Sequence, residues 1–245
     1  QILGATGNIN LINDETDIDI ASGAVITANN VLLQAKSNSV NVNGGSVAAA
    51  SKLTLDAANV QLASGALQAA TAVATASKDI TMTGGNINAT TATMTANNNI
   101  AMNGGSMNAT TATMTASNNI NLTTGALQAN TASLVARNGS ITEASSGFVL
   151  DVANVTATAN GGITLDSIAN QLEKVTVANT NGDVAIGSGN SQNSNALTVL
   201  TKANGQVNGN LTIINYVDDS NIKNAIAFSD TLTASGNITI TNQDA

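Results

Sequence analysis

Two consecutive stretches of twenty residues carry nearly the same sequence, and this repeat limits what the chain can fold into. The first stretch, 78–97, reads KDITMTGGNINATTATMTAN, and the second, 98–117, reads NNIAMNGGSMNATTATMTAS. A third stretch, 118–137, keeps apolar residues at the same positions but changes their identity, with Leu122 in place of Met102. A short, fixed period of this kind is typical of repeat architectures, in which each unit stacks on its neighbours.

Each repeat contains three short segments in which apolar and polar residues alternate. In the second repeat they are 100–102, the residues around Met107, and 112–116. Alternation with a period of two places successive side chains on opposite faces of a strand, and the Thr, Asn and Gly residues at the bends disfavour a helix. The pattern predicts a three-sided parallel β-solenoid in which twenty residues form one coil, meaning one complete turn around the axis. The leucine-rich repeat has a similar length, but its L-x-x-L-x-L pattern is absent.

The apolar columns of such a solenoid can be followed along the chain. One column is expected at Ile18, Val40, Val60, Ile80, Ile100, Ile120, Ile141 and Ile163, and a second at Val25, Val47, Leu67, Ile87, Met107 and Leu127. The four methionines at alternating positions, Met82, Met94, Met102 and Met114, are expected to point inward.

The whole chain, 1–245, is predicted to form one domain. Regular coils are expected over 1–137, and less regular ones over 138–245, where 181–203 is read as one coil. The predicted fold is an all-β, right-handed parallel β-helix with about 20–23 residues per coil and roughly eleven coils, and its hand follows from the strong preference of parallel crossovers.

The composition agrees with this fold and excludes several classes of function. The 245 residues include no Pro, Cys, His or Trp, and 42% are hydrophobic while 9% are charged. Without His or Cys, Ser-His-Asp and Cys-His catalysis and His or Cys zinc sites are excluded. The net charge is −8 and the seven Lys and Arg residues are scattered, so no nucleic-acid partner is expected. No apolar run approaches the roughly 20 residues of a transmembrane helix, so no membrane insertion is expected either.

The acidic residues do not form a recognisable active site in the sequence. Four of them stand alone along the chain: Asp56, Asp79, Asp166 and Asp183. The cluster at 14–19 is interpreted as a solvated corner from which Asp17 and Asp19 point outward. We therefore expect no catalytic residue, no cofactor and no metal, and the nonapeptide calcium repeat is absent.

Several coils open with the pattern G-N/D-I-x-L/I or a close variant of it. It occurs at 7–11, 118–122, 161–165, 182–186 and 236–240. The pattern resembles the filamentous-haemagglutinin-like exoproteins, which are large adhesins and haemolysins that Gram-negative bacteria export by two-partner secretion. The secretion domain of that family carries Asn-Pro-Asn motifs. Because this chain has no proline, it is more similar to the repetitive shaft that follows that domain.

The resemblance implies a non-catalytic stalk segment of a large adhesin, secreted or held on the outer surface of a Gram-negative bacterium. It also implies an outer-membrane secretion partner, and a receptor or glycan on a host or neighbouring cell. Two alternatives remain open at this point. One is a carbohydrate-active β-helix enzyme, and the other is an ice-binding or self-assembling surface fibre.

Rows of threonine are the feature behind the ice-binding alternative. Thr91, Thr93 and Thr95 are expected to face outward and to stack on the equivalent residues of the next coils, which are Thr111, Thr113, Thr115, Thr131 and Ser133. Thr is also simply a favourable outward residue of strands. At the bends, 97–99 over 117–119 is expected to form amide ladders.

The stretch YVDDSNIKNAIAF at 216–228 is expected to be an excursion from the solenoid and the place of partner contact, because long excursions from a regular scaffold often carry function. The candidate contact residues are Tyr216, Asp218, Asp219, Lys223 and Phe228. The alternative is a cover, in which Ile222, Ala225 and Ile226 pack onto the coils.

Strand patterns also lie close to both ends of the sequence, at 9–11 and 238–240, without a charged or helical cap. Uncapped solenoid edges pair readily with another chain. We therefore expect more of the same solenoid on these edges, or end-to-end stacking of copies.

Overall fold

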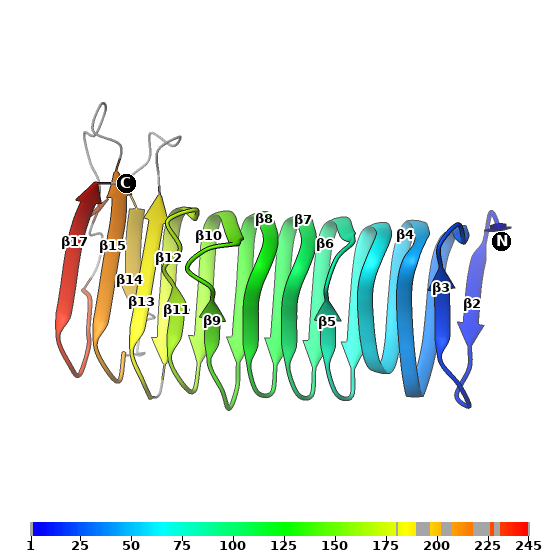
Figure 1. Ribbon diagram of the computed structural model, residues 1–245, viewed down its shortest axis with the longest axis horizontal. Coiled ribbons are helices and arrows are strands. Elements are labelled where there is room, and N and C mark those ends of the chain that lie inside the picture. The colour runs from blue at the N-terminus through cyan, green and yellow to red at the C-terminus, as the bar shows by residue number, and fades with distance from the viewer. Residues whose placement is uncertain are drawn as a thin grey trace.

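The computed structural model describes residues 2–179, 181–189, 197–201, 207–217, 226–227 and 231–244. Within these residues the chain contains strands and loops but no helix, and it winds into a rod of about ten turns (Figure 1). The predicted parallel β-solenoid is confirmed, with close to the expected number of coils. At an inter-strand spacing of roughly 4.8 Å, the rod is on the order of 50 Å long.

Seventeen strands are present in the described part of the chain. The first nine are β1 (Ile2–Gly4), β2 (Asn8–Ile12), β3 (Ile18–Ala21), β4 (Val25–Ala76), β5 (Ile80–Met82), β6 (Asn86–Ala96), β7 (Ile100–Ala116), β8 (Ile120–Ala136) and β9 (Ile141–Glu143). The others are β10 (Phe148–Ala159), β11 (Ile163–Leu165), β12 (Gln171–Asn179), β13 (Val184–Gly189), β14 (Leu197–Thr201), β15 (Leu211–Val217), β16 (Ile226–Ala227) and β17 (Ile238–Asp244).

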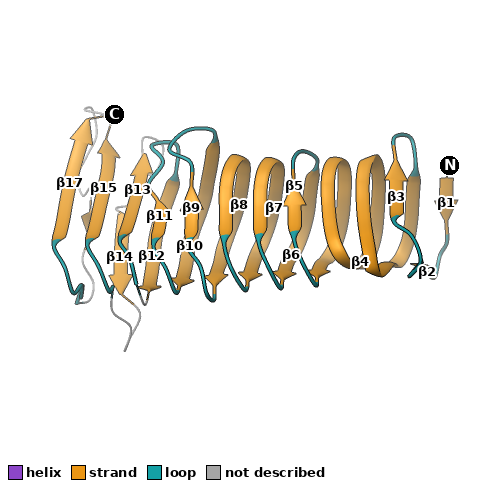
Figure 2. Cartoon of the chain, turned by 60° about the horizontal axis from the view of Figure 1, so that its bottom comes forward, coloured by secondary structure: helices purple, strands orange, loops and turns teal. Residues whose placement is uncertain are grey.

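The solenoid has three faces, because each regular coil contributes three strand segments. In one coil they are 80–82 on face 1, 86–89 on face 2 and 91–96 on face 3, and Thr90 forms the corner between the last two. Each segment pairs in parallel with the equivalent segment of the coils before and after it (Figure 2). Some long strands, such as β7 and β8, pass around all three faces without a break.

The first expected apolar column forms the core behind face 1. Ile80 pairs with Ile100 and Ile100 with Ile120, and each of these side chains is at most 1% exposed. The column extends beyond the predicted members to Val184 and Leu211. All four predicted methionines are also buried, with exposures of 0–2%. The alternation in the sequence therefore predicted which side chains fill the core.

The prediction for one member of the second apolar column, Val25, is wrong. Val25 is half-buried, and Ile26 is the buried residue at 4% exposure. Before it, the chain turns at 22–23, where the N–H of Ala24 donates to the carbonyl oxygen of Ala21 (3.0 Å), and the pairing register shifts at Ala21. This turn displaces the alternation by one residue, which moves the next side chain to the opposite face.

The expected coil at 181–203 is also wrong in length. Val184 pairs with Leu211 and Leu211 with Ile238, so both coils hold twenty-seven residues. The stretches 204–207 and 208–211 both consist of Asn-Gly, one polar residue and an aliphatic residue. The sequence alone does not show which of them opens the next coil, and the pairing register uses the second.

A column of glycines lines the corner between faces 1 and 2. It includes Gly65, Gly85, Gly105 and Gly125, which all have positive φ angles. A Cβ atom on Gly105 would lie 2.6 Å from the carbonyl oxygen of Gly84 and closer still to that of Gly85. The backbones of successive coils therefore approach one another here more closely than any side chain allows.

The expected amide ladder at the corner before face 1 is confirmed for 98 over 118 and for 99 over 119. Oδ1 of Asn99 accepts hydrogen bonds from the backbone N–H (3.1 Å) and the side-chain amide (3.3 Å) of Asn119, while the N–H of Asn99 donates to Asp79 (3.0 Å). Beside this column, the amide of Asn118 donates to Oδ1 of Asn98 at 2.6 Å. Side chains thus satisfy backbone groups at the bend.

Replacing Asn99 by Ala is expected to lower the free energy of unfolding by about 1–3 kcal/mol, because the part-buried N–H of Asn119 loses its acceptor. Denaturant unfolding would measure this change. Asn88→Ala is the control, since the exposed Asn88 side chain should contribute less than about 0.5 kcal/mol. Equal losses in the two variants would contradict a stabilising ladder.

The first and last described strands present open edges at opposite ends of the rod (Figure 1). Ile2 is 81% exposed at one end, and Ile238 and Ile240 are 43% and 44% exposed at the other. The idea that further coils or a second copy cover these edges stays a prediction.

Candidate functional site

The predicted contact residues are only partly placed. Tyr216 is half-buried and continues strand β15 on face 1, where it pairs with Gly189 and Gln243. It therefore lies within the solenoid ladder, although the excursion was expected to begin there. The other four predicted contact residues, Asp218, Asp219, Lys223 and Phe228, lie outside the described residues. So do Ile222 and Ala225 of the alternative cover.

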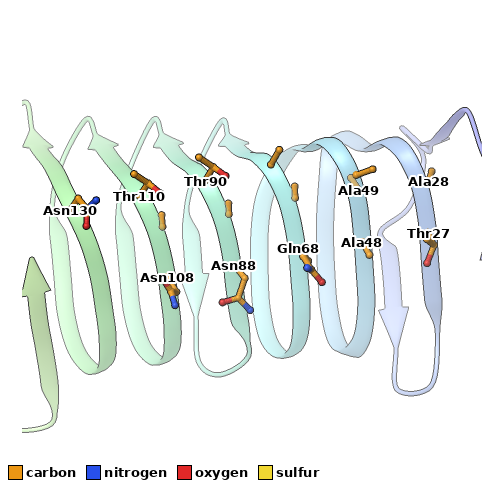
Figure 3. Close-up of a pocket in the computed structure, with 15 residues that line it drawn as sticks. Thr27, Ala28, Ala48, Ala49, Gln68, Asn88, Thr90, Asn108, Thr110 and Asn130 are labelled. Carbon is orange, nitrogen blue, oxygen red and sulfur yellow. The ribbon is translucent and has the colours of Figure 1, made fainter.

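A long, shallow groove runs along the corner between faces 2 and 3, with a volume of about 690 Å³ (Figure 3). Alanines such as Ala69 and Ala109 form its floor. The exposed amides of Gln68, Asn88 and Asn108 stand in register on successive coils and form a row along one side (Figure 3).

The groove offers hydrogen-bonding groups but no side chain that could act as an acid, a base or a stacking partner. All of its lining residues are Ala, Thr, Asn or Gln, so it contains no ionisable and no aromatic side chain. A general acid or base requires a titratable group, and stacking against a flat ligand ring requires an aromatic side chain. The groove can therefore hold an extended polar molecule through amides, but its own side chains cannot supply acid–base catalysis.

A second hollow, of about 480 Å³, lies over face 1 and its preceding corner. Asp79 is the one carboxylate that lines it, and the other lining residues include Asn99, Asn119 and Gln61. The Asp79 carboxylate already accepts hydrogen bonds from the corner amides. A glycosidase ordinarily uses two opposed carboxylates, and this hollow provides one.

The acidic cluster at 14–19 lies on the surface, as expected. Asp17 and Asp19 are exposed, and they accept hydrogen bonds from the N–H of Ser39 (2.8 Å) and the amide of Asn41 (2.7 Å). In the part of the chain that the structure describes, no three His, Cys, Asp or Glu side chains are close enough together to hold a metal ion.

The threonine rows on face 3 are in the expected register. Thr93 pairs with Thr113 and Thr113 with Ser133, so their side chains stack along the rod. In the neighbouring row, Thr115 pairs with Val135 and Val135 with Thr158, so one coil in this row lacks a hydroxyl. Binding of ice by this small lattice stays a prediction.

A buried polar cluster was not anticipated from the sequence, and Glu143 is its centre. The side chain is 6% exposed and occupies the position of Leu122 in the previous coil. Oε2 of Glu143 accepts hydrogen bonds from the amide of Asn170 (2.7 Å) and the N–H of Ser167 (3.3 Å). Oε1 has no hydrogen-bond partner in the structure.

The cluster connects successive coils at a corner where the regular backbone ladder is interrupted. Oδ1 of Asn170 accepts the N–H of Leu150 (2.9 Å), and Oγ of Ser188 accepts the N–H of Leu172 (2.9 Å). Oγ of Ser188 also lies 3.2 Å from the carbonyl oxygen of Asn170. We call Glu143, Ser167, Asn170 and Ser188 the Glu143 clasp.

Comparison with protein families, with curated proteins and with solved structures found no match to this chain. Among the described residues, no helix is long and apolar enough to cross a membrane.

Proposed function

We propose that this chain is a non-catalytic structural segment, a shaft within a large secreted or cell-surface adhesin. The proposal rests chiefly on one observation, which is that the apolar column behind face 1 runs in register from Val60 to Leu211, over most of the rod. Stacked coils of this kind hold their ends at a fixed distance, which suits a spacer.

The surface chemistry supports the same proposal. The larger groove has no ionisable residue and the smaller hollow has a single carboxylate, Asp79. The outer-membrane secretion partner, the receptor or glycan on another cell and the Gram-negative surface location rest on the resemblance of the coil openings to filamentous-haemagglutinin-like exoproteins.

A whole-coil deletion tests the spacer. Removing the twenty residues 95–114 joins Met94 to Thr115 and preserves the alternation. We expect a folded rod that is shorter by roughly 4.8 Å. In the surface-displayed parent protein, we expect adhesion to target cells to persist, because a spacer changes reach and not contact. Adhesion and scattering measurements would be compared with those of the unaltered protein.

The matched control removes nineteen residues, 95–113, which places Met114 directly after Met94 and reverses the alternation of that strand. This variant should fold poorly. Loss of adhesion in the variant lacking 95–114, with folding intact, would place a contact site on the deleted coil and contradict a pure spacer.

A further inference from the structure

Glu143 is an ionisable side chain in a column that is otherwise apolar. Leu122 of the previous coil pairs with it. In the next two coils, Leu165 and Ile186 pair with each other and follow Ile163 and Val184 by two residues, as Glu143 follows Ile141. Leu122, Leu165 and Ile186 are at most 1% exposed. A carboxylate that is removed from water in such surroundings is unfavourable unless charges or hydrogen bonds compensate for the lost hydration.

Compensation by charge is absent at this corner among the described residues. Asp166 is the one charged group that acts on Glu143, and its like charge opposes ionisation. The residues that the neighbouring strands bring to the clasp are uncharged: Leu122 of β8 pairs with Glu143, Leu150 of β10 donates to Asn170, and Ser188 of β13 accepts from Leu172. The two hydrogen bonds to Oε2 favour the ionised form, but Oε1 has no partner.

The balance of these effects favours a neutral carboxyl at pH values below about 7. Burial raises the pKa of Glu143 from 4.5 to about 7, with a further contribution from Asp166, while the hydrogen bonds from Asn170 and Ser167 act in the opposite direction. The geometry and the pKa therefore agree that the folded corner holds its proton more tightly than the unfolded or opened chain does.

We propose that the Glu143 clasp is a proton-dependent lock between the coils on either side of it. With Glu143 neutral, the clasp keeps the corner at 166–170 closed against β10 and β13. When Glu143 ionises, its charge is better stabilised in water than in the closed corner, so opening becomes more favourable. Opening releases Leu150, Leu172 and their neighbours from the side-chain hydrogen bonds that replace the backbone ladder.

The direction of the pH dependence follows from proton linkage. An opened corner releases its proton above about pH 4.5, whereas the closed corner keeps it up to about pH 7. Closure is therefore strongest at acidic pH. It weakens as the pH rises from about 4.5 to about 7, and it changes little at higher pH. Between pH 5 and 8 the opening equilibrium should grow on the order of one hundred-fold.

Hydrogen exchange at three backbone amides tests the lock. The N–H groups of Leu150, Ser167 and Leu172 each donate to a side chain of the clasp. After correction for the intrinsic effect of pH, their protection in the unaltered protein should fall on the order of one hundred-fold from pH 5 to 8. Protection at Met107, in the regular coils, should stay constant.

Two variants separate the lock from a general pH effect. Glu143→Gln keeps the shape of the side chain but cannot ionise, so protection at the three amides should lose its pH dependence. Glu15→Gln makes the same change at an exposed site and should retain the dependence of the unaltered protein. A fall in protection that is equal in Glu143→Gln and in the unaltered protein would overturn the proposal.

A second pair of measurements tests the proton-dependent lock even if Glu143→Gln does not fold. Asp166→Asn removes the like charge, so protection should reach its lower plateau at a lower pH. Carbon-detected NMR of the Glu143 carboxyl in the unaltered protein should show titration near pH 7. Titration near pH 4.5, or protection that is independent of pH, would refute the lock.

Discussion

Replacing Met102 by Asp is expected to lower the free energy of unfolding by about 4 kcal/mol, the largest loss that we predict for a single residue. Met102 is fully buried between Met82 and Leu122 of the adjacent coils. An Asp at this position would bury a carboxylate with no cation beside it, and it would leave a cavity where the longer side chain had been. Denaturant unfolding followed by circular dichroism would measure the loss.

Two controls isolate the burial of charge. Met102→Leu keeps an apolar side chain of similar volume and should cost less than about 1.5 kcal/mol. Ala101→Asp places the same carboxylate on the adjacent residue, which faces outward over face 1, and should cost less than about 1 kcal/mol. An equal effect of Asp at positions 101 and 102 would contradict the alternation on which the fold depends.

Replacing Gly105 by Ala is expected to cost about 3 kcal/mol, although it adds a single methyl group. Part of the cost is the positive φ of 79°, which any side chain disfavours by about 1 kcal/mol. The rest is overpacking, because the added carbon would contact the carbonyl oxygens of Gly84 and Gly85 and force the two coils apart. Thermal or denaturant unfolding would give the value.

Gly23→Ala is the matched control for this prediction. Gly23 has nearly the same φ, 76°, but nothing lies within 4 Å of a Cβ placed on it. Its replacement should therefore show the conformational cost alone, about 1 kcal/mol. If the two glycine variants lose the same amount of stability, the close approach of the coils contributes nothing to the cost of replacing Gly105.

The fold could be predicted from the sequence because its core depends on local alternation repeated at a fixed period. Ile80, Ile100 and Ile120 each follow the same polar bend, so their stacking requires no knowledge of distant contacts. The prediction for Val25 was wrong because a turn before it inserts a residue, and such a turn has no signal in the apolar pattern.

The Glu143 clasp was missed for two different reasons. The position of Glu143 carried a usable signal, since the stretch 139–143 aligns with 118–122 and puts a carboxyl where Leu122 points inward. Its partners carried none. Asn170 and Ser188 are common polar residues, and their burial depends on how two lengthened corners fold over one another.

The groove between faces 2 and 3 also has one part that the repeat in the sequence reveals and one part that it does not. Its amides at Gln68, Asn88 and Asn108 follow the repeat and could have been aligned from the sequence. The hollow itself depends on small alanines at a corner, where the shape follows from backbone curvature and not from the alternation of side chains.

The parallel pairing of each coil with the next has a consequence for how the chain acquires its structure. Residues that pair in successive coils are twenty to twenty-nine positions apart, so contacts between coils stay local in the sequence, which is a property that helical bundles share. The loop-closure entropy for adding one coil is modest and the same for each addition. A solenoid of this kind can therefore grow from one end as its chain becomes available, without waiting for distant segments to meet.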